Sequence, residues 1–515
     1  MAEGVVAKTG KRFISQQSLD AAVWGACNIL RRSGASGALA YIPELTWMLF
    51  LRILDQREAR DAFFYAANDI TFTPSLAYPY RWQDWAAPGG AKRVELERGT
   101  AGAYKTFVND DLLPHLRGLR DRPNATARQK IISQIVSGVE RTRVDTERNL
   151  LDVLDKVNTI NEESVDTTHI FPLSQVFEGL LLKMGEKGND GGQFFTPREV
   201  IRAMVRAVFT HTGGLQNGQT VYDPCCGTGG FLAQAYEYIL DATGENLTGP
   251  LLDALANQTF YGREKDNTIY PIALASLVLH GIDTPRVWHG NTLTKHETYG
   301  GLWQGAPSEF DIVLTNPPFG GKEGKDAQIN YSYKTSATQV LFVQEVVKSL
   351  KRGGTCGIVL DEGVLFRTSE GAFHDTKRWL LDECDLWAIV SLPGGVFTAA
   401  GAGVKTNLLF FTKGEPTKST WYYDLSDIKV GKKTPLTLNR FDDFFALLST
   451  RGDSDRSWTI TRAEIEAKHY DLKAVNPHAK DETDIRTPAE LLDIIARKGE
   501  EVEAALAELR RLTRT

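Results

Sequence analysis

The middle of the chain alternates between apolar runs of strand length and longer runs with helical spacing. This alternation limits the possible folds more than any other feature. The pairs, in chain order, are QTVYD with GGFLAQAYEYIL, TFYGRE with NTIYPIALASLVLHG, FDIVLT with ATQVLFVQEVVKSLKRGG, and TCGIVL with DTKRWLLDEC. Repeated strand–helix pairs predict a mostly parallel sheet with helices on both faces, which is an α/β fold. The later strands LWAIVSL, TNLLFFTK and TWYYDL have no helical run between them, and we expect an antiparallel edge there.

The rest of the 515 residues divides into a front part and a tail, because one hydrophobic core rarely spans a chain of this length. Residues 1–168 show helical spacing of apolar residues, as in LDAAVWGACNILR, and predict an N-terminal helical domain. Residues 169–427 carry the α/β alternation, and residues 428–515 are a C-terminal extension. The extension ends in a predicted amphipathic helix, whose apolar residues recur at near-heptad spacing at Leu491, Ile494, Ile495, Val502, Leu506 and Leu509.

Composition indicates in which cellular compartment the protein works and which partners it has. The chain has no run of about 18 apolar residues and no N-terminal secretory pattern, so we expect no membrane span and no export. Its five cysteines include no CxxC pair and its histidines lack metal-ligand spacing, so we expect no metal site, no disulfide framework and a reducing cytoplasm. The formal net charge is −6, whereas a protein that holds DNA alone usually has a basic surface.

A glycine-rich turn, DPCCGTGGF, connects the first predicted strand of the sheet to its helix. Glycines at such a turn allow a ligand to approach the backbone closely, and the helix N-terminus favours a carboxylate. The spacing of the glycines differs from the GxGxxG dinucleotide pattern. Glu264 ends the second strand, where an acid in nucleotide-binding sheets accepts hydrogen bonds from ribose hydroxyls. Each feature alone is also compatible with a tight turn and a surface acid, but together they predict a nucleotide-like ligand.

The third strand ends in IVLTNPPFGGKEG, which places an amide, two prolines and an aromatic ring at one corner. Pro317 and Pro318 have no N–H to donate and must end the strand. The exocyclic amine of a nucleobase is a poor nucleophile, because its lone pair is delocalised into the ring. Two acceptors, the Asn316 side-chain oxygen and the Pro317 carbonyl, would favour a pyramidal nitrogen with an accessible lone pair. Phe319 could stack on a base flipped out of its helix. The alternative is a proline-capped strand end with a surface aromatic residue.

The ordered series GGQFFTPREV, DPCCGTGGF, NPPFG and LPGGVF followed by GVKTNLLFF resembles the modification subunit of Type I restriction–modification systems. That family is one of class I S-adenosylmethionine-dependent amino-methyltransferases, and the resemblance covers most of the chain. It implies a Rossmann-like α/β core with a helical domain in front and a helix behind. The implied activity is adenine-specific DNA N6-methylation with S-adenosyl-L-methionine as methyl donor. The implied partners are DNA, a specificity subunit, a second modification subunit and a restriction subunit, in the cytoplasm.

The resemblance also implies roles for individual residues. The catalytic group would be Asn316, Pro317, Pro318 and Phe319. The cofactor group would be Phe195, Thr196 and Pro197 at the methionine end, Asp223, Gly227, Thr228 and Gly229 around the glycine turn, Glu264 at the ribose and Asn291 near the adenine. Related enzymes often have an acid where this chain has Asn291, so the polarity is kept and the charge is not. No metal is required, because the sulfonium already carries the leaving group.

The residues themselves leave three other functions open. NPPF alone does not separate adenine N6 from cytosine N4 as the methylated amine. A methyltransferase for a protein glutamine amide also presents a planar nitrogen to an NPP motif. The third alternative is a scaffold with a methyltransferase fold and no activity, against which the intact glycine turn and tetrapeptide argue.

Recognition of a DNA sequence is expected to lie outside this chain. The interval 223–316 has room only for the next strands and helices of the sheet, and fewer than a hundred residues follow Asp424. A domain that reads a sequence usually buries on the order of 1,000 Å² or more against DNA. We therefore expect a separate specificity subunit, docked partly through the terminal helix.

Overall fold

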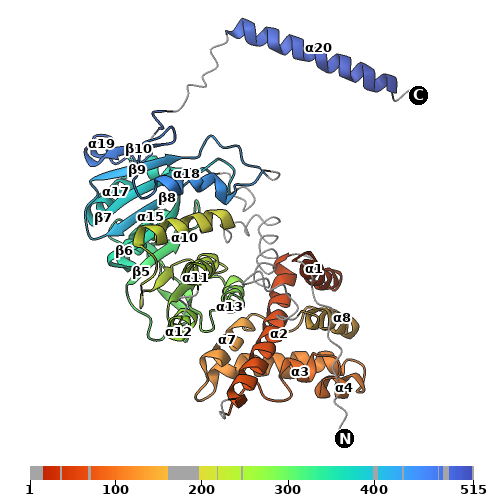
Figure 1. Cartoon of the computed structure of the whole chain (residues 1–515). Coiled ribbons are helices and arrows are strands. Elements are labelled where there is room, and N and C mark those ends of the chain that lie inside the picture. The colour runs from red at the N-terminus through yellow and green to blue at the C-terminus, as the bar shows by residue number, and fades with distance from the viewer. Residues whose placement is uncertain are drawn as a thin grey trace. The chain divides into compact units, whose positions relative to one another are not determined.

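The computed structural model describes residues 16–34, 38–67, 71–160, 196–216, 218–244, 248–397, 404–431, 434–473, 475–478 and 487–512. Two compact units are present, Met1–Ala474 and Val475–Thr515. Figure 1 shows the chain and labels many of its helices and strands. The first unit contains the front helices and the α/β sheet, and the second contains the terminal helix. The boundaries expected at residues 168 and 427 remain predictions.

The described residues from 16 to 160 form helices and no strand, which agrees with the expected helical front part. The helices are α1 (Gln16–Arg32), α2 (Ala38–Ala67), α3 (Trp82–Trp85), α4 (Ala91–Glu97), α5 (Ala103–Thr106), a π-helical turn (Phe107–Leu112), α6 (Leu113–Arg117), a 3-10 turn (Gly118–Asp121), α7 (Ala127–Ile135) and α8 (Glu147–Asn158). Their core is aromatic: Trp85 stacks on Trp47 at 6.2 Å and meets the edge of Trp82 at 5.5 Å between ring centroids. Large rings bury much apolar area, so they stabilise short helices that would be marginal alone.

The front helices pack directly on the α/β part through α13 (Ile269–Leu279). Every residue of α13 is buried. Helices α2 and α7 contact α13, and α11 (Gly230–Thr243) contacts it as well. A helix that is apolar on all sides can be stable only when it is surrounded, so the front helices provide part of its cover.

Ten strands form one sheet in the order β10-β9-β7-β8-β6-β5-β1-β2-β3-β4. They are β1 (Val221–Asp223), β2 (Phe260–Glu264), β3 (Arg286–Asn291), β4 (His296–Tyr299), β5 (Phe310–Thr315), β6 (Leu350–Asp361), β7 (Cys384–Ser391), β8 (Thr406–Lys413), β9 (Ser419–Asp424) and β10 (Ser457–Thr461). The pairs β3–β2, β2–β1, β1–β5 and β5–β6 are parallel, as the alternation predicts. The strand order reverses between β1 and β5, and ligands of open α/β sheets bind at such a switch point.

The antiparallel pairing differs from the expected edge arrangement. β10 is an antiparallel edge strand on β9. However, β8 lies inside the sheet, antiparallel to both β6 and β7. An apolar run indicates that a strand is buried on both faces but not its direction, so this insertion could not be predicted from the pattern.

Helices cover both faces of the sheet (Figure 1). In β5, Ile312 and Leu314 belong to a cluster with α10, α11 and α13, whereas Val313 belongs to one with α15 and α17. Successive side chains of a strand point to opposite faces, so both faces are packed. The remaining helices of this unit are α10 (Arg198–Thr212), α12 (Gly249–Asn257), α14 (Lys325–Gln328), α15 (Thr338–Ser349), α16 (Glu362–Phe366), α17 (Gly371–Glu383), a 3-10 turn (Leu438–Phe441), α18 (Asp442–Leu447) and α19 (Arg462–Ala467).

The second unit contains α20 (Pro488–Leu512), the terminal helix that the sequence predicts. Five of its large apolar side chains are exposed, namely Leu492, Ile495, Val502, Leu506 and Leu509. Over the described part of the chain, no helix has both the length and the hydropathy required to cross a membrane.

Candidate active site

A cavity of about 270 Å³ lies at the carboxyl ends of β1, β2, β3 and β5, beside the switch point. It brings together residues from Thr196 to Phe342, which are up to 146 positions apart in the sequence. Eight predicted site residues line it: Thr196, Asp223, Gly227, Thr228, Glu264, Asn291, Asn316 and Pro318. Pro197, Gly229, Pro317 and Phe319 are adjacent in the chain to lining residues without lining the cavity themselves, and Phe195 lies outside the described residues.

The glycine turn is shaped by two residues with left-handed backbone. Gly227 has a φ of 54° and Gly229 a φ of 82°, a region that side chains other than glycine rarely adopt. A Cβ on Gly229 would also lie 3.0 Å from the Leu277 side chain of α13. Gly229 therefore allows the packing of α11 against α13, while Gly227 faces the cavity.

Asp223 connects the ends of β1 and β5 below this turn. Its Oδ1 accepts hydrogen bonds from the Thr315 hydroxyl at 2.6 Å and from the Cys225 N–H at 3.0 Å. The side chain is only 1% exposed. Burial raises the pKa of Asp223 to about 7, and the hydrogen bond from Thr315 opposes this rise.

Glu264 connects the end of β2 to the glycine turn. Its Oε2 accepts the Gly227 N–H at 3.0 Å, and its Oε1 accepts the Lys265 and Asp266 N–H groups, both at 2.8 Å. Burial raises the pKa of Glu264 to about 7, and the backbone donors oppose this rise. A carboxylate has about four acceptor sites, so about one remains for a ligand.

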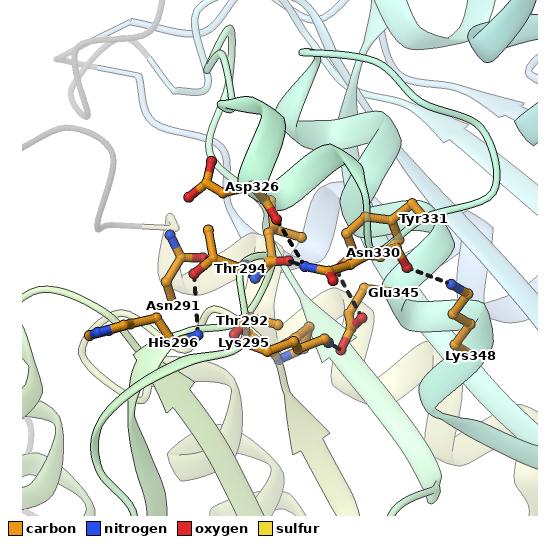
Figure 2. A network of polar contacts seen from close by, with 12 residues as sticks. Asn291, Thr292, Thr294, Lys295, His296, Asp326, Asn330, Tyr331, Glu345 and Lys348 are labelled. Atoms are coloured by element: carbon orange, nitrogen blue, oxygen red, sulfur yellow. Dashed lines mark hydrogen bonds and ion pairs between the residues drawn. The ribbon is translucent and has the colours of Figure 1, made fainter.

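Asn291 stabilises the loop that follows β3. Its Oδ1 accepts the N–H groups of Leu293 at 2.9 Å and Thr294 at 3.3 Å. The Asn330 side chain donates to the Leu293 carbonyl at 2.8 Å (Figure 2). An acid at this position could accept the same two N–H groups, so this local contact does not require an amide.

An ion pair and a hydroxyl extend this network below the loop (Figure 2). Lys295 donates to Oε1 of Glu345 at 2.6 Å, and the Tyr331 hydroxyl donates to its Oε2 at 2.9 Å. Glu345 is 5% exposed, and both of its oxygens are paired. Pairing is important here because a buried carboxylate without partners is costly. The network attaches one wall of the cavity to α15.

The NPPF corner forms another part of the cavity wall. The Asn316 amide nitrogen donates to the Thr196 hydroxyl at 2.9 Å, and its Oδ1 is buried with no hydrogen-bond partner among the described residues. The Pro317 carbonyl accepts the Gln339 amide at 3.2 Å. The Phe319 ring is half-buried and meets Phe397 edge to face, with ring centroids 5.2 Å apart. Two oxygens that could accept hydrogen bonds and a half-buried ring therefore lie at the end of β5, and their predicted roles remain predictions.

Comparisons with known proteins identify the family of the chain. Residues 168–485 match the N-6 DNA methylase family model, and residues 19–157 match the HsdM N-terminal domain model. The methylase subunit of Type I restriction enzyme EcoEI from Escherichia coli is 32% identical over 488 residues, covering 90% of this chain and 91% of that protein. The chain belongs to the N-6 DNA methylase family.

Two solved structures extend the match to the fold of this methylase. One, from work on assembly and conformational transition of a type I restriction–modification system, is 34% identical with a TM-score of 0.73, covering 97% of this chain and 98% of that one. The other is a modification subunit of a putative type I restriction enzyme from Vibrio vulnificus YJ016, 30% identical with a TM-score of 0.76, covering 92% and 99%. The predicted fold, the family and the activity of a Type I adenine N6-methyltransferase with S-adenosyl-L-methionine as methyl donor are thereby confirmed. The alternatives left open by the residues are not favoured.

Sequence reasoning missed several residues that line the cavity of this N-6 DNA methylase, among them Arg198, Gln234, Arg263, Lys265, Asp266, Glu323, Thr338 and Phe342. Arg263 precedes Glu264, and its guanidinium lies between the rings of Trp288 and Trp303, at 4.8 and 5.0 Å. Its place beside a predicted ligand was the only available signal. Glu323 and Thr338 hydrogen-bond each other at 3.0 Å across a loop without periodicity, so no pattern pointed to them. Within the described ranges, no cluster of three or more His, Cys, Asp or Glu side chains could hold a metal ion.

Proposed function

We propose that the Asn316 side-chain oxygen and the Pro317 carbonyl accept hydrogen bonds from the two hydrogens of the adenine N6 amine. We also propose that the residues around the glycine turn hold S-adenosyl-L-methionine beside them. The observation that carries this proposal is the Asn316 Oδ1, which is buried and has no donor among the described residues. A buried acceptor without a partner costs roughly 1–3 kcal/mol. Such a cost is typical of a group that meets its partner only when a substrate binds.

The chain fixes the direction in which this oxygen points. The Thr196 hydroxyl accepts from Nδ2 of Asn316 at 2.9 Å, which holds the planar amide in one orientation, and its oxygen is proposed to meet the substrate amine in the cavity that Asn316 lines. The Pro317 carbonyl has two lone pairs, and Gln339 occupies one. One lone pair therefore remains for the second hydrogen of the amine.

Phe319 is proposed to stack on the flipped base. Its edge-to-face contact with the buried Phe397 fixes the plane of the ring while leaving the ring half-buried. Flipped bases are commonly held by such stacking together with contacts to their polar edge. Pro318, the neighbour of this residue in the chain, lines the cavity.

The donor set of the cavity fits S-adenosyl-L-methionine. We propose that Glu264 holds the ribose, Asn291 and its loop border the adenine, and Thr196 borders the methionine end. The neighbouring residues proposed for the cofactor are Phe195, Pro197, Asp223, Gly227, Thr228 and Gly229. When bound, the cofactor supplies an electrophilic methyl group on a sulfonium. The chain's part is to orient the amine and exclude water, and no side chain is assigned as a general base.

The proposed partners follow from two features of the chain, the segment between β1 and β5 and the acidic net charge. Between β1 and β5 the described residues form only strands and helices of the sheet, and the formal net charge is −6. We propose that a specificity subunit reads the DNA and docks on the exposed apolar residues of α20 by burying them. A second modification subunit and a restriction subunit would complete the complex, in the cytoplasm. The division at residues 168 and 427 belongs to the same proposal.

Two measurements test these proposals. Mass analysis of nucleosides from DNA treated with the assembled complex should give N6-methyladenine; N4-methylcytosine as the product would overturn the assignment of the amine. Truncation before Pro488 should leave S-adenosyl-L-methionine binding unchanged, because α20 belongs to a separate compact unit, while weakening assembly with the specificity subunit. Sequence-specific methylation by the purified chain alone would contradict the partner proposal.

A further inference from the structure

The Pro317 carbonyl is held by a residue that no sequence pattern identified. Gln339 is the second residue of α15, and its Nε2 donates to the Pro317 carbonyl at 3.2 Å. Its Oε1 accepts the N–H of Asp361, the last residue of β6, at 3.1 Å. Because Oε1 receives a backbone N–H, the other atom of the amide must be the nitrogen. The side chain is 3% exposed.

This contact replaces a missing piece of the sheet. β5 and β6 are parallel neighbours, paired as far as Thr315 and Ile358. Beyond that point the two prolines have no N–H, so the ladder cannot continue. The Gln339 carboxamide takes the place of one peptide unit, with an acceptor for β6 and a donor for the end of β5. The Gln339 side chain thereby holds the Pro317 carbonyl in a fixed position within the NPPF corner.

We propose that Gln339 is a positioning residue for methyl transfer: it occupies one lone pair of the Pro317 carbonyl and directs the other toward the amine. This inference rests on the proposed function of the NPPF corner. Gln339 touches neither the substrate nor the cofactor and does not line the cavity. Its effect must therefore appear in the rate of the chemical step and not in cofactor affinity, since a misplacement of about 1 Å can cost ~10²-fold in rate.

The same helix offers a matched control. Gln344 is 1% exposed, and its amide also bridges a backbone acceptor and a backbone donor, the Tyr333 carbonyl at 2.9 Å and the Tyr333 N–H at 3.0 Å. Gln344 and Tyr333 do not line the cavity. Replacement of either glutamine removes one buried amide with two backbone hydrogen bonds, so a purely structural role predicts similar losses for both.

The first experiment compares Gln339→Met with Gln344→Met in the complete assembly with its specificity subunit. Methionine is neutral and similar in volume, so neither variant buries a charge. We expect kcat to fall tenfold to a hundredfold for Gln339→Met and less than threefold for Gln344→Met, with the Kd for S-adenosyl-L-methionine within twofold of wild type in both. Equal kcat losses in the two variants, or a normal kcat in Gln339→Met, would overturn the inference.

The second experiment uses the pH profile of Gln339→Glu. A glutamic acid keeps the acceptor for Asp361, but it can donate to Pro317 only when it is protonated. The kcat of Gln339→Glu relative to wild type should rise as the pH is lowered from 8 to 6, while that of Gln339→Met should not change. A flat ratio for both variants argues against the donor role. If the wild-type complex itself forms no N6-methyladenine, the proposed function fails; if it does and the Gln339 variants match it, only this inference fails.

Discussion

The glycine turn and the NPPF corner both line one cavity, but their polar atoms are satisfied to different degrees. At the turn, Asp223 and Glu264 together receive five hydrogen bonds from the chain itself. At the corner, the Asn316 Oδ1 receives none from the described residues. The two carboxylates on the cofactor side are thus mostly satisfied before any ligand arrives, whereas the proposed acceptor on the substrate side still requires the hydrogens of its substrate. Variants on the two sides should therefore fail in different measurements.

The largest effect is expected on the cofactor side. Gly227→Val should abolish measurable binding of S-adenosyl-L-methionine by calorimetry, because a β-branched residue is strained at a φ of 54° and its side chain would enter the cavity. Gly218→Val is the control, since Gly218 has a φ of 81° with open space around it and does not line the cavity. Normal binding by the Gly227 variant would mean that the turn is only structural.

On the other side, Asn316→Ala should remove methylation and spare the cofactor. We expect kcat to fall by several hundredfold or more, judging by the roughly 10²–10³-fold cost of deleting one positioned polar group elsewhere. The Kd for S-adenosyl-L-methionine should stay within about twofold, because the side-chain hydrogen bond that Asn316 makes among the described residues goes to Thr196 and not to the glycine turn. Single-turnover methylation and calorimetry measure the two quantities, and near-normal turnover would end the assignment of Asn316.

Thr196 lies between the two regions, and its hydroxyl orients the Asn316 amide. Thr196→Val keeps the branched shape of the side chain and removes the hydroxyl, so the amide is free to rotate. We expect kcat to fall about tenfold with a smaller change in cofactor affinity. Thr196→Ser, which restores the hydroxyl, should recover most of the activity. If Thr196→Val raises the Kd for S-adenosyl-L-methionine by a larger factor than it lowers kcat, Thr196 serves mainly in cofactor binding.

The smallest effect is a dependence of stability on pH. Burial raises the pKa of Asp223 and of Glu264 from ordinary values of 3.8 and 4.5 to about 7. Between about pH 4 and 7 the folded chain therefore holds protons that the unfolded chain releases, so these groups lower the free energy of unfolding as the pH rises. Asp223→Asn or Glu264→Gln removes one such group. The melting temperature of each variant minus that of wild type should increase from pH 4.5 to 7.5, and a constant difference would contradict the raised pKa.

The sequence predicted those parts of the site that carry a local signature. The glycine turn, the acid at the end of β2 and the two prolines each break a regular pattern at a strand end, and the parallel topology places strand ends together. Gln339 has no such signature: one polar residue in an apolar helical run is usually a solvent-facing position, but here it is buried. Its partners, Pro317 and Asp361, end different strands, so only the three-dimensional pairing reveals it.

The sequence did not predict the direction of every strand, because the spacing of apolar residues carries no information about direction. The runs that form β7, β8 and β9 read alike, yet β8 is inserted against the direction of its neighbours. β3 and β4 were not predicted at all, because RVWHGN and HETY are short and carry polar residues. β3 nevertheless brings Asn291 to the cavity, so an unremarkable strand supplies one wall of the site.

The complete burial of α13 has a consequence for how this protein is made. A catalytic core expressed without the front helices would leave α13 partly uncovered, and an exposed apolar helix invites aggregation or capture by chaperones. During synthesis, however, α2 and α7 leave the ribosome before α13 does, and N-terminal units generally fold first. Because α2 and α7 precede α13 in the chain, they are available to pack on α13 as soon as it is synthesised.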